Sequence, residues 1–247
     1  MWDWYTGTII WKTQNPWTAM RGQMYDYYLD PNACLYGLHS GSEPLHGMYN
    51  LITGTVGVVN NTFETKRDLM LVVKTHDMKG VDSLITQVFI EIQPSSSKNF
   101  LPIKTTIDKL AKDEGTFLSI QLLDVNKTVV SNNTYWLPDA EGNYSGLKKM
   151  PASQLKVSSK RINAGKVEVT LINPAKAPVA FFNRLSLINS ATKKRVLPVF
   201  YSDNYVSVLP GEQRKIILDY EPKDAGQQNM LSVSGWNLPE QLLPITN

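Results

Sequence analysis

The sequence predicts a mainly β chain, with two antiparallel β-sandwich domains that follow a short βα segment. Apolar and polar residues alternate over much of residues 47–137 and again after residue 153. Turn-rich breaks separate these alternating stretches, as in a sandwich of short strands. The chain has 247 residues, of which 42% are hydrophobic, and this suffices for one or two domains of about 100–200 residues with buried cores.

Residues 1–46 differ in character from the rest, because they hold four of the six Trp and five of the eleven Tyr residues. GTIIWK at 7–12 predicts a short buried strand. A helix over 17–29 is predicted from the spacing of its apolar residues, which are Trp17, Met20, Met24 and Tyr28.

A second short helix is predicted to run through Leu35 and Leu38. Asp30 would be its N-cap and Pro31 its first helical residue. The order strand, helix, short helix is typical of one βα unit.

The first sandwich is predicted over 47–137. Its candidate strands are 48–60, 68–76, 84–92 and 118–122, and the stretch 104–115 could hold a helical turn.

Residues 138–152 are rich in Gly, Pro, Ser and Asn and read as a linker. Alternation resumes beyond it, with strands predicted around 167–171, 185–187 and 216–220. We therefore assign 153–247 to a second sandwich, near the usual Ig-like size.

Charge and composition argue against several classes of partner. The net charge is only +3, with Lys and Arg scattered, so no nucleic-acid partner is expected. No apolar run reaches 18 residues, so no membrane span is expected. Cys34 is the single cysteine, and the three histidines show no ligand spacing, so we expect no metal site and no cofactor.

A string of motifs at 7–46 resembles a known enzyme family. NPW, then YDYYLD, YG and EPLH follow one another as they do at the end of the catalytic barrel in family 2 exo-β-D-glucosaminidases and the related endo-β-mannosidases. NTYWLPD at 133–139 resembles the end of the first Ig-like domain. VLPVFYSDNYVSVLPGE at 196–212 and VSGWN at 233–237 resemble the last domain.

The resemblance implies that this chain is the C-terminal portion of a larger glycosidase. Residues 1–46 would be the last βα unit of a (β/α)₈ barrel, and 47–137 and 153–247 two Ig-like domains. The parent would hydrolyse β-linked glucosamine or mannose, and its N-terminal catalytic part would be missing here. Glucosaminide or mannoside specificity and exo or endo action stay open. The chain itself assigns no compartment; for the parent we expect a secreted or periplasmic one.

The resemblance also implies that this chain holds no catalytic residue. Retaining glycosidases use two carboxyl groups about 5–5.5 Å apart, and in the family both glutamates lie on earlier barrel strands. We interpret the carboxylates near the barrel segment as structural: Asp3 before the strand, Asp26 within the helix, Asp30 as a cap and Glu43 at the domain junction.

Three residues are candidates for sugar binding. Trp11 would lie near the C-terminal end of the strand and present an aromatic wall to the sugar, as the resemblance implies. Asn15 and Trp17 follow in the next loop. Tyr201, Asn204 and Tyr205 could touch a glycan, although packing is the favoured role.

Two other functions are considered beside an enzyme fragment. One is a stand-alone Ig-like module that binds carbohydrate or protein, and the other is activity by complementation with a separate polypeptide. The barrel motif at 7–46 argues against a simple module. Because one βα unit cannot close a barrel, residues 1–46 are expected either to collapse onto the first Ig-like domain or to drive self-association.

Overall fold

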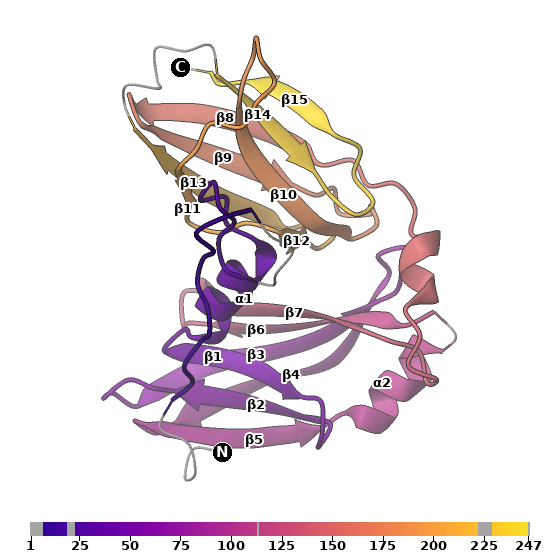
Figure 1. The fold of residues 1–247 in the computed structure, drawn as a ribbon. Helices are drawn as coiled ribbons and strands as arrows, with labels where there is room; N and C mark the ends of the chain where they lie inside the picture. The colour runs from indigo at the N-terminus through magenta and orange to yellow at the C-terminus, as the bar shows by residue number, and fades with distance from the viewer. Residues whose placement is uncertain (1–6, 19–22, 113, 222–228, 247) are drawn as a thin grey trace. The chain divides into compact units, whose positions relative to one another are not determined.

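The chain divides into two compact units, each built around one β-sandwich. The computed structural model describes residues 7–18, 23–112, 114–221 and 229–246. The first unit takes in His39–Pro151, and the second combines Gly7–Leu38 with Ala152–Asn247. We call the sandwich of the first unit (β1–β7) the N-terminal sandwich and that of the second (β8–β15) the C-terminal sandwich (Figure 1).

The N-terminal sandwich has a three-stranded sheet in the order β1-β2-β5 and a four-stranded sheet in the order β4-β3-β6-β7. All neighbouring strands in them are antiparallel. Their bounds are β1 (Leu45–Asn50), β2 (Thr55–Asn60), β3 (Lys66–His76), β4 (Asp82–Ile92), β5 (Ser96–Pro102), β6 (Thr116–Leu123) and β7 (Val129–Leu137).

The core of this sandwich comes from the alternating apolar residues. Val73 on β3 pairs with Ile120 on β6, and both side chains are fully buried together with Val58 on β2. Helix α2 (Lys104–Ala111) adds Ile107 and Ala111 to the buried residues. The helical turn and the strands predicted in this region are confirmed, with 48–60 divided into β1 and β2. On the edge strand β4, however, the predicted apolar face is buried only at its end (Ile90, Ile92), while Leu84 and Val88 are exposed.

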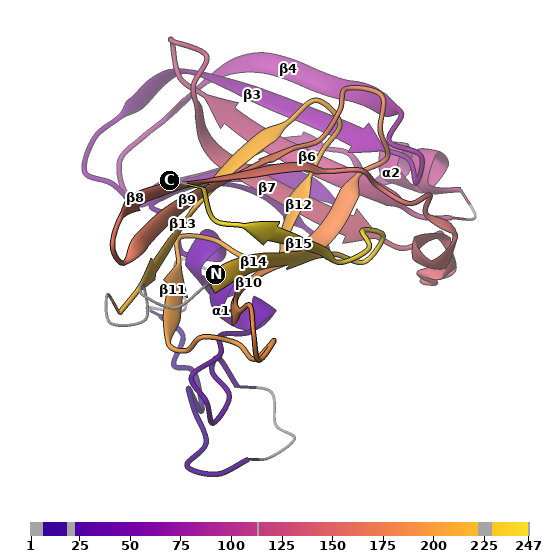
Figure 2. The same cartoon turned by 90° about the horizontal axis from the view of Figure 1, so that it is seen from above.

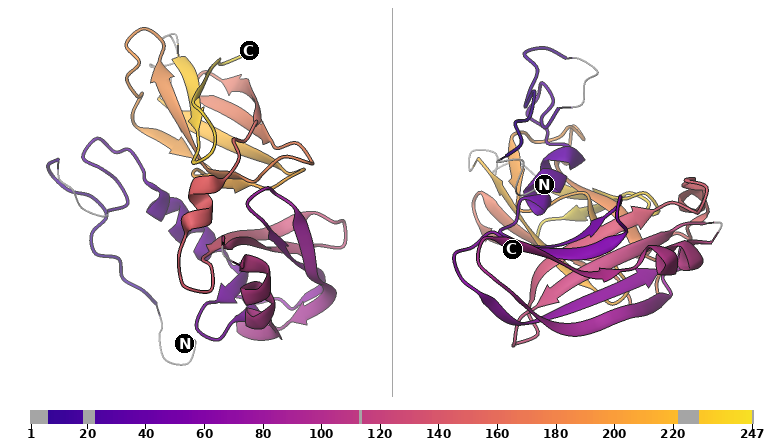
Figure 3. Two further views of the ribbon diagram at one scale, coloured as in Figure 1. Left: turned by 90° about the vertical axis from the view of Figure 1, so that its right-hand side faces the viewer. Right: turned by 90° about the horizontal axis from the view of Figure 1, so that it is seen from below.

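The C-terminal sandwich has two four-stranded antiparallel sheets, in the orders β11-β13-β9-β8 and β12-β10-β14-β15 (Figures 2 and 3). Their strands are β8 (Lys156–Asn163), β9 (Lys166–Ile172), β10 (Ala180–Asn189), β11 (Val199–Tyr201), β12 (Val206–Val208), β13 (Gln213–Tyr220), β14 (Asn229–Ser234) and β15 (Gln241–Pro244).

The core of this sandwich again follows the sequence pattern. Val169 pairs with Ile216 in one sheet, Leu187 pairs with Leu231 in the other, and all four side chains are buried. The mainly β fold class with antiparallel sandwiches is confirmed. Between the two sandwiches in sequence, Ser145–Lys149 forms a short 3₁₀ helix.

Helix α1 (Ala33–Gly41) confirms the second predicted helix, but the predicted elements before it are wrong. Residues 7–12 form no strand, and Ile9 and Trp11 are 95% and 85% exposed. Among 17–29, the described residues 17–18 and 23–29 are not helical; 19–22, with Met20, lie outside the described residues. Residues 7–38 group with the second unit and 39–46 with the first, so the expected collapse of 1–46 as a whole onto the first sandwich is wrong. The alternative, self-association, stays a prediction.

Candidate functional site

The loop between Thr13 and Asn32 is shaped by local hydrogen bonds in place of the predicted helix. Asp26 Oδ1 accepts hydrogen bonds from the backbone N–H groups of Tyr28 (2.8 Å) and Asp30 (3.0 Å). Such carboxylate-to-backbone bonds compete with helical hydrogen bonding and favour a turn. The turn places Leu29 at φ 64°. We call residues 13–18 and 23–32 the pocket loop.

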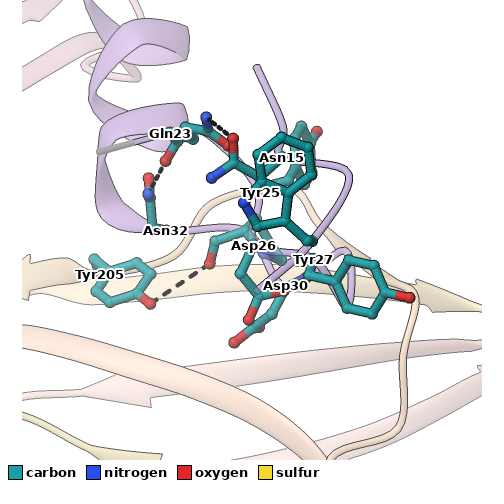
Figure 4. Close-up of a pocket in the computed structure, with 10 residues that line it drawn as sticks. Asn15, Gln23, Tyr25, Asp26, Tyr27, Asp30, Asn32 and Tyr205 are labelled. Atoms are coloured by element: carbon teal, nitrogen blue, oxygen red, sulfur yellow. Dashed lines mark hydrogen bonds between the residues drawn. The ribbon is translucent and has the colours of Figure 1, made fainter. Parts of the chain in front are cut away.

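Amide side chains link the two described parts of the pocket loop to each other and to the start of helix α1 (Figure 4). Gln23 Nε2 donates to Asn15 Oδ1 at 2.7 Å, and Asn32 Nδ2 donates to the backbone carbonyl of Gln23. Asn32 Oδ1 accepts from the N–H of Cys34 at 3.0 Å, which is the capping bond that Asp30 was predicted to make. The N-cap prediction for Asp30 is therefore wrong.

Asp30 instead binds the C-terminal sandwich of its own unit. Its Oδ2 lies 2.6 Å from Arg184 Nη2 and also contacts Arg195. The guanidinium of Arg184 lies 5.7 Å from the ring centre of Tyr205, whose hydroxyl is 3.5 Å from the carbonyl of Pro31. These contacts hold the pocket loop against β10 and the segment before β12.

A small pocket of about 130 Å³ forms where the pocket loop meets Tyr205. Ligand pockets for drug-sized molecules are typically about 300–1,000 Å³, so this one has room for a single small group such as one sugar ring or part of one. Aromatic, amide and carboxylate side chains and one proline line it together: Asn15, Trp17, Gln23, Tyr25, Asp26, Tyr27, Asp30, Pro31, Asn32 and Tyr205.

The structure brings two of the three predicted site residues together. Asn15 and Trp17 both line the pocket, with Asn15 buried and Trp17 64% exposed. Trp11 is not among the lining residues. Sequence reasoning did not favour Tyr205 as a site residue, because nothing in the sequence brings it next to the pocket loop.

Tyr201 and Asn204 have the packing role that was favoured for them. Asn204 Oδ1 accepts from the N–H of Leu185 at 2.8 Å, and Tyr201 Oη accepts from the N–H of Leu187 at 3.1 Å. Burial raises the pKa of Tyr201 to about 12 and also raises the pKa of Tyr36, so both phenols stay neutral at physiological pH.

Comparison with known proteins decides which family this architecture resembles. Residues 133–238 match the Ig-fold domain of exo-β-D-glucosaminidases. The chain is 28% identical to the exo-β-D-glucosaminidase of Amycolatopsis orientalis, over 97% of this chain and 25% of that protein. It is 29% identical to the mannosylglycoprotein endo-β-mannosidase of Lilium longiflorum, over 98% of this chain and 32% of that protein.

The solved structures agree with the sequence comparison. A variant of the exo-chitosanase CsxA of A. orientalis, in complex with PNP-β-D-glucosamine, matches with a TM-score of 0.81 and 26% identity, over 97% of this chain and 31% of that one. The chain is homologous to a C-terminal portion of exo-β-D-glucosaminidases. It spans about a quarter to a third of the length of these relatives.

The carboxylates near the motif string have structural contacts. Asp26 shapes a turn and Asp30 is bound to two arginines. Glu43 Oε2 lies 3.7 Å from Nδ1 of the buried His46. Asp3 lies outside the described residues.

The described ranges show no cluster of three or more His, Cys, Asp or Glu side chains that could hold a metal ion. Helices long and apolar enough to cross a bilayer are likewise absent from these ranges.

Proposed function

We propose that this chain is the non-catalytic C-terminal part of a retaining glycosidase that acts on β-linked glucosamine or mannose. In this proposal residues 1–46 belong to the catalytic barrel, 47–137 and 153–247 are its two Ig-like domains, and 138–152 link them. The role of the chain is to support one side of the substrate site.

The extent of the similarity is the observation that carries this proposal. The alignments cover 97–98% of this chain but only 25–32% of the relatives, so two thirds or more of each relative has no counterpart here. A retaining mechanism needs two carboxyl groups about 5–5.5 Å apart. The nearby carboxylates Asp26 and Asp30 are instead bound to backbone N–H groups and to arginines. We infer that the catalytic pair lies in the part without a counterpart.

The pocket loop is proposed to supply sugar contacts. The indole of Trp17 is exposed beside a pocket lined by amides and carboxylates, and a flat ring of this kind suits the apolar face of a pyranose. Asn15 would keep Gln23, the pocket residue next to it, in place by accepting its hydrogen bond. Trp11, exposed before the pocket loop, would become an aromatic wall once the rest of the barrel covers it.

A sugar titration of the purified chain tests these contacts. Glucosamine and methyl β-D-mannoside are added while tryptophan fluorescence is recorded, and weak binding with a Kd of about 1 mM is expected. Trp17→Phe should weaken that binding by about tenfold, because the smaller ring loses contact area and stacking.

Trp236→Phe is the matched control, since Trp236 is a 56% exposed tryptophan of the same unit outside the pocket. It should leave the Kd unchanged. Absence of binding to either sugar, or equal effects of the two substitutions, would contradict the proposed sugar contacts.

A further inference from the structure

The contacts of Asp30 join residues far apart in the sequence. Asp30 lies at the end of the pocket loop and Arg184 is 154 residues further along, on β10. The Asp30 side chain is only 14% exposed, while the arginine side chains at positions 184 and 195 keep 33% and 41%. A carboxylate at this depth needs partners, because an unpaired buried charge is strongly unfavourable.

The same contacts also position Tyr205, the pocket residue that the C-terminal sandwich contributes. Arg184 binds Asp30 with one guanidinium nitrogen and lies over the ring of Tyr205. Tyr205 has φ 54°. Its ring centre lies 6.1 Å from that of Tyr36 and 5.5 Å from that of Phe182. One arginine therefore touches both sides of the pocket: the pocket loop through Asp30, and the C-terminal sandwich through Tyr205.

We infer that Asp30 is a positioning residue, which through Arg184 and Arg195 holds the pocket loop on the C-terminal sandwich and so forms the pocket. The C-terminal sandwich is then a structural determinant of sugar binding as well as a support. The significance for sugars rests on the proposed function; the attachment of the loop does not. Asp30 itself needs no contact with the reacting atoms for this role.

The geometry explains why a charged side chain is required at position 30. The pocket loop has little regular structure, and its backbone reaches the sandwich through a long hydrogen bond, from the Tyr205 hydroxyl to the Pro31 carbonyl at 3.5 Å. Charge-assisted bonds from two arginines to one carboxylate are about twice as strong as neutral hydrogen bonds. Asparagine at position 30 would keep the shape but lose this attraction.

Hydrogen–deuterium exchange of the full chain tests the attachment. Asp30→Asn is expected to speed exchange at residues 23–32 by about tenfold, because loop opening no longer breaks two ion pairs. Exchange in the strands β9 and β13 should stay unchanged, which excludes general unfolding. Arg184→Met and Arg195→Met should give smaller increases in the same residues, and Asp30→Glu should restore part of the protection.

Asp219→Asn is the matched control. Asp219 forms an exposed ion pair with Lys166 at 3.1 Å in the same sandwich, away from the pocket loop. It should leave exchange at residues 23–32 unchanged. The double variant Asp30→Asn with Arg184→Met should speed exchange by less than the two single effects combined, because both substitutions remove the Asp30–Arg184 ion pair.

Two readouts separate this inference from the proposed function. Unchanged exchange at 23–32 in Asp30→Asn, or additive effects in the double variant, would overturn the positioning role. If exchange rises as expected, the sugar titration is repeated on Asp30→Asn. A Kd raised about tenfold with an unchanged melting temperature supports both ideas. A wild-type chain that binds no sugar but shows the exchange effect would keep the attachment and reject the sugar site.

Discussion

His46 on β1 is a buried histidine that the fold holds in its neutral form. Its Nε2 lies 3.1 Å from Nδ2 of Asn133, which is a donor, so Nε2 must accept. Burial lowers the pKa of His46 below its ordinary value of 6.5, and the Glu43 carboxylate, 3.7 Å from Nδ1, opposes this shift without cancelling it. Protonation would make Nε2 of His46 a donor that faces the Nδ2 donor of Asn133, and this hydrogen bond would be lost.

The stability of the N-terminal sandwich should therefore depend on pH through His46. The unfolded chain takes up the proton at about pH 6.5, before the folded chain does, so the free energy of unfolding is highest above that pH and falls as pH drops below it. Urea unfolding between about pH 5 and 8 measures the slope of the free energy of unfolding against pH. His46→Gln should flatten it, and His39→Gln, at an exposed position, should not. Equal slopes in wild type and His46→Gln would show that this histidine does not control the effect.

Asp30 shows what local sequence rules can and cannot predict for a single residue. Asp-Pro before an apolar run predicts a helix cap, and α1 does begin close by, at Ala33. The capping bond, however, comes from Asn32, and Asp30 binds arginines more than 150 positions away. Sequence spacing carries no information on such contacts. Asn15 and Trp17 could be predicted as site residues only through the family resemblance.

At the scale of elements, β1 packs close to β6 because Gly47 has no side chain. A Cβ atom at Gly47 would lie 2.8 Å from Cγ2 of the buried Ile120. Gly47→Ala should lower the free energy of unfolding by about 1–3 kcal/mol, since the core must shift to accept a methyl group.

Gly37 offers the opposite case in helix α1. A Cβ there would meet nothing within 4 Å, so Gly37→Ala should raise the stability of the helix by up to about 1 kcal/mol through helix propensity. Urea unfolding of both variants tests the pair. Stabilisation by Gly47→Ala would contradict the close packing of β1 on β6.

The elements that could be predicted are those whose partners the chain itself contains. Apolar patterning located β3, β6, β9 and β13, because each buries apolar side chains within its own sandwich. The apolar run at 7–12 also has the composition of a buried strand, but a strand needs neighbours for its backbone groups. In the described part of the chain none pairs with it, and Ile9 and Trp11 are exposed.

For the whole molecule, we propose a division of labour between this chain and a catalytic part that corresponds to the portion of its relatives without a counterpart here. Both sandwiches have complete apolar cores, so each unit has what it needs to stay folded. The pocket is small, and the carboxylates that line it, Asp26 and Asp30, are engaged in structural contacts. These features favour the proposed role of the chain, which is to support a substrate site.

Hydrolysis of nitrophenyl β-D-glucosaminide and nitrophenyl β-D-mannoside by the purified chain is the measurement that tests this division most directly. We expect no release of nitrophenol above the buffer rate, because a retaining mechanism needs a carboxyl pair that we place outside the chain. Clear turnover that a single Asp or Glu substitution in this chain abolishes would contradict the proposed non-catalytic role, and would place the catalytic residues within these 247 residues.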